Sequence, residues 1–370
     1  MVLINDDLSS REKTLLTLLG KDPDTPSKIL LDATGYQYQA TLSRKKKELH
    51  KKGYIRGPYY HINLNAVGNN ELFDVYTDIQ FDVSDYDFVF KLIQGIRCWR
   101  WIYPALQGDR FFVYFQSNYY TQISRLLHLI KKEGVIDYSF YSSQNRWVGE
   151  NPDFFGEEML SYDNLFEQCE LPEMNYPYQP ISKAWKPIDI RIMGYLQVRP
   201  CNIDSIQEFE QKSYGTMWKK NQINYRIQKL INYKIAERKH YNIAPYPRDK
   251  CFSFLLFVET ADPVVTLQVL RNLGRRCRVY KAYTSAGETG ILLCWVSIRN
   301  MPTFLSGLED MEEIWIKAYQ LKAHTSPHMV KQSFDVSNFD PQSQRWIFPY
   351  KEYRDCINHL LEERSEIQQK

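Results

Sequence analysis

Long apolar segments are missing from this chain of 370 residues, and their absence excludes one class of protein. No run approaches the ~18–20 apolar residues that a helix needs to cross a bilayer. The chain begins MVLINDDLSSREK, which turns acidic and polar at once and therefore lacks the apolar core of a secretion signal. We expect a cytoplasmic protein without a membrane partner.

Clustered cysteine and histidine residues are also lacking. The seven cysteines are scattered without a CxxC pair, which is typical of reduced thiols in a cytoplasm rather than of a disulfide framework or zinc site. His324 and His328 are four residues apart, but Pro327 lies between them and disrupts a helical metal clamp. We expect neither a metal ion nor a cofactor.

A large excess of charge of one sign is absent as well, because 47 Lys and Arg nearly balance 44 Asp and Glu. A basic region in this chain is therefore a local concentration that acids elsewhere offset. Residues 36–61 hold seven Lys and Arg against one acid, and residues 212–250 hold ten against two. Most charge runs are solvated faces of the fold, so the surroundings of these two decide their role.

The first basic concentration coincides with a helix-turn-helix pattern. Residues 9–19 open with a Ser-x-x-Glu capping box, and residues 25–35 form a second expected helix with Pro26 at its start. A third helix is expected over 36–53, followed by a short β-hairpin in 54–65. This order predicts a winged helix-turn-helix, in which the third helix enters the major groove of DNA.

The chain repeats this arrangement at an offset of about 180 residues. Helices are expected over 186–198, 203–213 and 216–235, and ERKHYNIAP follows as a second wing. Leu42 and Leu49 of the first third helix correspond to Ile223 and Leu230 of the second. The second basic concentration thus falls on a second recognition helix and wing.

Behind each helical unit comes the order strand, helix, strand, a turn with Gly and an acid, strand, helix, strand. This is a βαββαβ ferredoxin-like unit. We therefore predict an α+β fold by internal duplication, with two winged helix-turn-helix domains alternating with two βαββαβ ferredoxin-like domains. The expected segments are winged helix-turn-helix domains at 1–68 and 186–247, ferredoxin-like sensor domains at 71–148 and 250–325, an acidic linker at 149–185 and a C-terminal extension at 326–370.

The duplicated unit resembles the Lrp/AsnC (leucine-responsive) family of regulators. The resemblance rests on this order of domains and on Lys45-Lys46, Leu49, Gly53 and Ile55 at the end of the third helix. It implies that two sensor domains pair, so two modules in one chain resemble a covalent dimer, with a further homodimer possible. It also implies a small-molecule effector near the Gly-acid turns, at Gly108, Asp109, Gly287 and Glu288.

Basic residues that coincide twice with a recognition element favour double-stranded DNA as the partner. Side-chain chemistry divides the candidate contacts into groups that read base edges and groups that bind phosphate. In the first copy Gln37, Gln39, Thr41 and Arg44 are expected at bases, and Lys45, Lys47, Lys51, Lys52 and Arg56 at phosphates. The second copy offers Lys219, Lys220, Asn221, Gln222, Asn224 and Arg226 on the helix, with Arg238 and Lys239 in the wing.

The leading hypothesis is thus a DNA-binding transcriptional regulator without catalytic residues. The main alternative is an enzyme, because the siroheme decarboxylases resemble this architecture and use it for tetrapyrrole chemistry. His128 lies within a predicted helix, and no cluster of His, Arg and Tyr stands out in the sensor halves as an acid–base set. A scaffold that has lost both activities is the third possibility.

Overall fold

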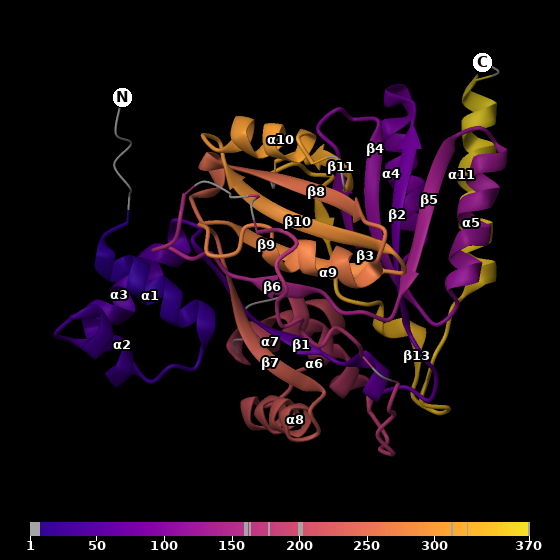
Figure 1. Cartoon of the computed structure of the whole chain (residues 1–370). Helices are drawn as coiled ribbons and strands as arrows, with labels where there is room; N and C mark the ends of the chain where they lie inside the picture. The colour runs from indigo at the N-terminus through magenta and orange to yellow at the C-terminus, as the bar shows by residue number, and fades with distance from the viewer. Residues whose placement is uncertain are drawn as a thin grey trace.

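The computed structural model describes residues 8–158, 162, 164–176, 178–198, 203–311, 314–323 and 325–368. His324, named above, lies outside these ranges. A unit of three helices followed by one strand occurs twice along the chain (Figure 1). The first consists of α1 (Ser10–Lys21), α2 (Ser27–Thr34), α3 (Gln39–Lys51) and β1 (Ile55–Ile62), and the second of α6 (Pro187–Val198), α7 (Ile203–Tyr214), α8 (Lys220–Asn232) and β7 (Ala236–Ile243).

Helix α1 begins at the predicted capping box. The Ser9 hydroxyl accepts a hydrogen bond from the Glu12 N–H at 3.3 Å, and the Glu12 carboxylate accepts one from the Ser9 N–H at 2.9 Å. This exchange satisfies backbone donors that a helix start leaves without an intrahelical partner. Helix α2 ends at Gly35, whose φ of 67° is the left-handed conformation that glycine adopts without strain.

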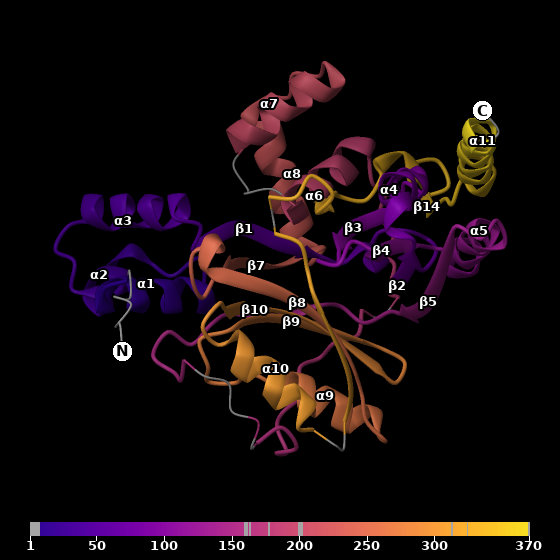
Figure 2. The same cartoon turned by 90° about the horizontal axis from the view of Figure 1, so that it is seen from above.

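Each helical unit leads into an antiparallel sheet of ferredoxin-like topology, as predicted. The elements of the first are β2 (Phe73–Phe81), α4 (Tyr86–Gly95), β3 (Trp99–Pro104), β4 (Arg110–Ser117), α5 (Tyr120–Lys132) and β5 (Ile136–Ser143), and those of the second are β8 (Cys251–Glu259), α9 (Pro263–Asn272), β9 (Tyr280–Ala286), β10 (Thr289–Ser297), α10 (Met301–Glu309) and β11 (Trp315–Gln320). In sheet order the first is β5-β2-β4-β3 and the second β11-β8-β10-β9. Two helices of each unit cover the outer face of its sheet, and the apolar residues beneath them form separate cores (Figure 2).

The two sheets pack against each other through their inner faces. Tyr76 and Phe112 of the first sheet and Phe257 and Leu293 of the second belong to one apolar cluster. The rings of Phe112 and Phe257 lie 5.7 Å apart between centroids. The sensor-to-sensor contact expected from the duplication is therefore present within a single chain.

Each module also adds a strand to the sheet of the other. Strand β6 (Val148–Glu150) leaves the first module and pairs with β9, and β12 (Val330–Lys331) leaves the second module and pairs with β3. After β12 the chain forms β13 (Phe339–Asp340), β14 (Arg345–Trp346) and α11 (Tyr350–Gln368), which packs on α4 and α5. Where the chain divides into independently folding domains stays a prediction.

The expected hairpin in 54–65 is wrong. One strand, β1, follows α3, and it pairs antiparallel with β7 of the other module, with Ile55 opposite Ile243 and Ile62 opposite Ala236. The alternating pattern predicted extended structure but contains no information about the partner strand, which lies far away along the chain. Helix α1 contacts β7 and α6 contacts β1, so each helical unit rests on the strand of its counterpart.

Within the described chain, no helix is both long and apolar enough to span a membrane.

Asn151, in the segment after β6, ties α1 and β7 to that segment, and we expect its removal to loosen them. Its amide nitrogen donates to Gly20 O and Tyr241 O at 2.9 Å each, and its amide oxygen accepts from the Ile243 N–H at 2.8 Å. Asn151→Ala should lower the free energy of unfolding by about 2–3 kcal/mol, because it leaves these backbone groups without partners. Urea unfolding of the full chain measures this.

The control is Asn69→Ala, since the exposed Asn69 amide donates one bond, to Ser343 O at 3.3 Å. It should cost less than about 0.5 kcal/mol. Equal losses for the two variants would contradict the bridging role of Asn151.

Candidate functional site

Part of the predicted DNA-contact set lies on the exposed face of the third helices. On α3 the Arg44 side chain is 69% exposed and lies 3.8 Å from Glu48. Thr41 is only half-exposed. The exposed members of the set are Gln37, Gln39, Arg44, Lys47, Lys51 and Lys52 in the first unit, and Lys219, Lys220, Asn221, Gln222, Asn224 and Arg238 in the second.

Other members of the set form ion pairs inside the protein. The Lys45 ammonium lies 3.3 Å from Glu12 and 2.9 Å from Glu48, and these carboxylates raise the pKa of Lys45. The Arg226 guanidinium lies 3.1 Å from the fully buried carboxylate of Asp189. Lys229 binds the same carboxylate at 3.1 Å. Arg226 therefore neutralises a buried acid, and its predicted position at the DNA surface is not what the structure shows.

The expected wing residues belong to the β1–β7 pair. Lys239 forms an ion pair with Asp24 of the first module at 2.5 Å. The Arg56 guanidinium stacks over the ring of Trp295, 4.3 Å from its centroid. Arg56 and Arg238 each line a cavity beside the strand pair. Arg56 is half-buried there, whereas Arg238 is also exposed to solvent.

The two Gly-acid turns lie outside both of these cavities. Gly108 has a φ of 83° and Gly287 a φ of 65°. Turn positions with such positive φ values favour glycine. Glu288 is exposed and Asp109 half-buried. A ligand-binding role for these residues stays a prediction.

The two cavities flank the β1–β7 pair. The first cavity, of about 570 Å³, lies on the side of α1 and the segment after β5; the second, of about 590 Å³, lies on the side of α6 and the segment at β12. Both volumes suit a medium-sized organic ligand. The first is lined by Thr17, Gly20, Lys21, His61, Trp147, Gly149, Glu150, Asn151, Pro152, Asp153, Arg238, His240, Tyr241, Asn242, Tyr280 and Ala282. The second is lined by Arg56, Tyr59, Tyr195, Gln197, Val198, Phe209, His240, Asn242, Tyr280, Leu293, Trp295, Met329, Lys331, Gln332 and Ser333.

Two histidines stack on each other where β1 and β7 pair. The rings of His61 and His240 are stacked, with centroids 4.2 Å apart and planes at 18°. Burial, with Arg238 and the opposing ring contributing, lowers the pKa of His61 to about 3, and burial lowers the pKa of His240 to about 4. Both imidazoles are therefore neutral at neutral pH. His240 lines both cavities, and its Nδ1 is buried without a hydrogen-bond partner among the described residues.

The second cavity combines aromatic walls with cations. Tyr280 stacks on Trp295 at 4.1 Å between centroids, and the Lys331 ammonium lies 5.2 Å from the centroid of the Tyr103 ring. Burial raises the pKa of Tyr280, so its phenol stays protonated. Among the described residues that line this cavity, none is Asp or Glu. Such a lining suits a planar ligand that carries negative charge.

The first cavity has a mixed electrostatic character. Lys21 and Arg238 line it together with Glu150 and Asp153. Glu150 accepts a hydrogen bond from Tyr283 Oη at 2.9 Å, forms an ion pair with Arg271, and lies 3.4 Å from the Lys281 ammonium. Three residues of the second module therefore hold the Glu150 carboxylate in place. The first cavity therefore contains carboxylates beside its cations, whereas no described residue lining the second is an acid.

The two stacked histidines, Tyr280 and Trp295 were not predicted from the sequence. One feature of the sequence could have identified His61 and His240. Both strands carry adjacent Tyr and His in opposite order, Tyr60-His61 and His240-Tyr241. At an offset of 180 each histidine corresponds to a tyrosine of the other copy. A wing built only for phosphate contact has no need for these residues.

Comparison with known proteins gives structural likenesses only. No protein-family model matches the chain, and no curated protein sequence matches it. A crystal structure of the siroheme decarboxylase NirDL aligns over 96% of this chain and 99% of its own, with 12% identity and a TM-score of 0.48. The same enzyme in complex with an iron-uroporphyrin III analogue aligns over 95% and 99%, with 13% identity and a TM-score of 0.45. The structure of MtbAldR aligns over 37% of this chain and 93% of its own, with 23% identity and a TM-score of 0.27.

The lowered pKa values of the stacked histidines predict a loss of stability in acid. A histidine whose folded pKa lies below its unfolded value of about 6.5 contributes stability that is present above that value and is lost as the pH falls toward the folded pKa. With folded values of about 3 and 4, each histidine should cost about 1–2 kcal/mol between pH 7.5 and pH 5. Denaturant unfolding at both pH values measures this cost.

His61→Gln and His240→Gln should each lose that part of the acid sensitivity. The exposed His128 of α5 provides the control, since His128→Gln should leave the pH dependence unchanged. If all three variants destabilise in acid as the wild type does, the buried pair is not the cause.

Proposed function

We propose that this chain binds a large planar ring bearing several carboxylates, a tetrapyrrole of the siroheme class, in the second cavity and acts on it as a decarboxylase. The observation that carries the proposal is the combination of Trp295 and Tyr280 walls with Arg56 and Lys331 in a cavity of about 590 Å³ without a described lining carboxylate. A flat ring stacks on such aromatic side chains, and its carboxylates bind the cations.

The lining residues also suit the proton transfer that decarboxylation requires. When a ring substituent leaves as CO₂, the C–C bond breaks and its electron pair stays on the substrate carbon, which must take up a proton. Tyr280, held protonated by burial, is a donor, and the neutral His240 can relay a proton to it from solvent. In this scheme Arg56 and Lys331 orient the ring through carboxylates that remain.

DNA binding by α3 is the second candidate, and one observation favours it. Arg44, Lys47, Lys51 and Lys52 are exposed on one helix and its end, where they can reach phosphates. Helix α8 has fewer basic side chains for phosphate contacts, because Arg226 and Lys229 form ion pairs with Asp189. A DNA-binding form of this protein would therefore depend on its first helical unit.

The ring proposal is tested by titrating the purified chain with uroporphyrin and following its absorbance. Arg56→Met and Lys331→Met should each weaken binding by about 10–100-fold, because each removes a charged partner of a ligand carboxylate. Lys51→Met, on the exposed end of α3, is the matched control and should bind as the wild type does. Incubation with siroheme followed by mass spectrometry should detect loss of CO₂.

Equal affinity of all three variants would exclude the second cavity as the ring site. Ring binding without any loss of CO₂ would support the binding function and contradict the proposed decarboxylase activity.

The DNA candidate is tested separately by measuring affinity for a pool of duplexes at several salt concentrations. Lys47→Ala combined with Lys51→Ala should lower the slope of log affinity against log salt by about 2, since each phosphate contact contributes about 0.9. Arg226→Lys, which keeps a cation beside Asp189, should leave the slope unchanged. An identical slope for the double variant and the wild type would exclude DNA binding through these lysines.

A further inference from the structure

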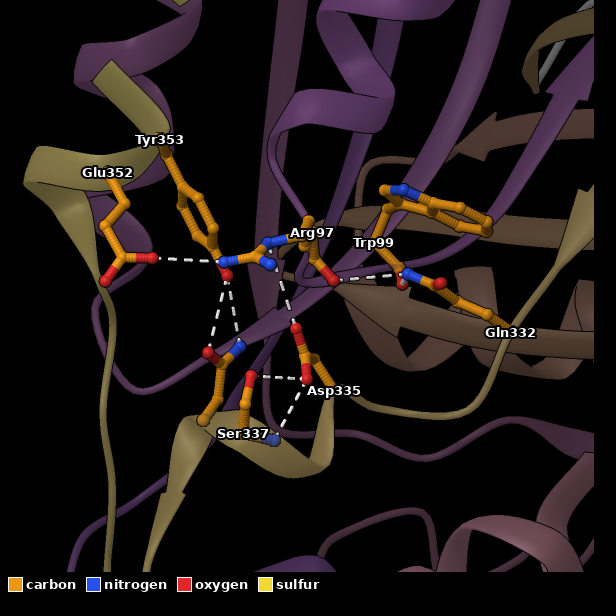
Figure 3. A network of polar contacts seen from close by, with 8 residues as sticks. Arg97, Trp99, Gln332, Asp335, Ser337, Glu352 and Tyr353 are labelled. Atoms are coloured by element: carbon orange, nitrogen blue, oxygen red, sulfur yellow. Dashed lines mark hydrogen bonds and ion pairs between the residues drawn. The ribbon is translucent and has the colours of Figure 1, made fainter. Parts of the chain in front are cut away.

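A C-terminal segment, residues 329–335, closes one side of the second cavity and fixes a bulge in the first sheet. Figure 3 shows the Gln332 side-chain amide donating to the carbonyls of Arg97 and Trp99, at 3.1 and 2.7 Å. The Gln332 N–H also donates to Arg100 O at 3.0 Å. In β3 the register with β4 shifts between Trp99 and Trp101, so Arg100 occupies the bulge. Bulges commonly redirect a side chain beside a functional site.

Polar contacts around the bulge hold this segment in place. The Arg97 guanidinium lies 3.1 Å from Glu352 of α11 and 4.0 Å from Asp335 (Figure 3). The Asp335 carboxylate accepts from Ser337 N–H at 2.9 Å. On the other side of Gln332, Val330 and Lys331 pair with β3, so the C-terminal segment is anchored on both sides of Gln332. The backbone that presents Arg100 is held firmly.

The Arg100 side chain is buried and short of partners. It is 7% exposed, and its guanidinium lies over the ring of Phe334, 5.5 Å from the centroid. Nη2 donates to Gln197 Oε1, while Nε and Nη1 are buried without a hydrogen-bond partner among the described residues. No described acid lies within ion-pair distance of it, although the buried carboxylate of Asp74 attracts it from farther away. A buried cation in this condition is destabilising, which indicates that the fold retains Arg100 for a purpose other than stability.

Gln197 connects this cation to the second cavity. It lies near the end of α6, it lines the cavity, and its amide oxygen is the one acceptor that Arg100 has among the described side chains. Gln332, whose backbone binds that of Arg100, lines the same cavity. An amide oxygen is a neutral acceptor with one contact point, whereas a carboxylate offers two oxygens to the planar guanidinium. A ligand carboxylate is therefore the better partner.

We propose that Arg100 is a carboxylate-binding residue of the second cavity, reached when the Gln197 side chain turns away from it. The inference rests on the proposed function, because it assigns one carboxylate of the ring to one residue. It also gives Gln197 a role in specificity, since only an acceptor stronger than its amide displaces it. Arg56 and Lys331, which also line this cavity, hold other carboxylates of the ring.

This assignment predicts that stability and binding change in opposite directions. Arg100→Met keeps the length of the side chain and removes a buried charge that has no described acid within ion-pair distance. The empty protein should unfold at a temperature about 2–4 °C higher, while its affinity for uroporphyrin should fall about 10–100-fold. Arg100→Lys keeps the positive charge but lacks the planar guanidinium that binds both oxygens of a carboxylate. It should therefore recover part of the affinity.

The experiment measures thermal unfolding of the empty full-length chain and the Kd of three probes: uroporphyrin with eight carboxylates, coproporphyrin with four, and benzenehexacarboxylate. Arg125→Met is the control, because Arg125 of α5 is exposed and lines neither cavity. It should leave the unfolding temperature and all three Kd values unchanged.

The outcomes separate the two proposals. Arg100-dependent binding of benzenehexacarboxylate without binding of either porphyrin would support the carboxylate site and reject the ring. Porphyrin binding that Arg100→Met leaves intact would support the ring and overturn the role of Arg100. A lower unfolding temperature with unchanged affinity would make Arg100 a structural residue, and failure of all three probes would overturn the inference.

Discussion

The pairing of β1 with β7 is the interaction on which the rest of the molecule depends. Each strand follows one helical unit and pairs with the strand of the other, so neither module completes its surface alone. The pairing sets α1 against β7 and α6 against β1, and the hollows left on the two sides are the cavities. The stacked histidines lie on these strands. A duplicated chain therefore builds its site from both copies at once.

Divergence between the copies gives the two cavities different chemistry. Glu150 and Asp153 line the first, whereas the second contains Arg56 and Lys331 without a described carboxylate. The helical units differ similarly: α3 keeps exposed lysines, while Arg226 of α8 is bound to buried Asp189. In our account one copy has become a wall of the ligand site and the other retains a basic surface. A negatively charged ring then has one favourable place per chain.

Sequence reasoning succeeded where the determinants are local or periodic. Ser9 and Glu12 predicted the start of α1, and the ~180-residue repeat predicted the duplicated α+β architecture and the contact between sheets. It failed where a partner lies far along the chain. The pattern of β1 fits any antiparallel neighbour, and nothing near Arg226 shows that Asp189 is buried beside it. The second cavity, with Arg56 from one copy and Trp295 from the other, forms only when the two strands pair.

The stoichiometry of ring binding tests the central claim most directly. Calorimetric titration of the full chain with uroporphyrin measures the number of sites without assuming where they are. The account predicts one ring per chain, bound in the cavity whose described lining lacks acids. Two equivalent sites per chain, or no binding at all, would contradict it.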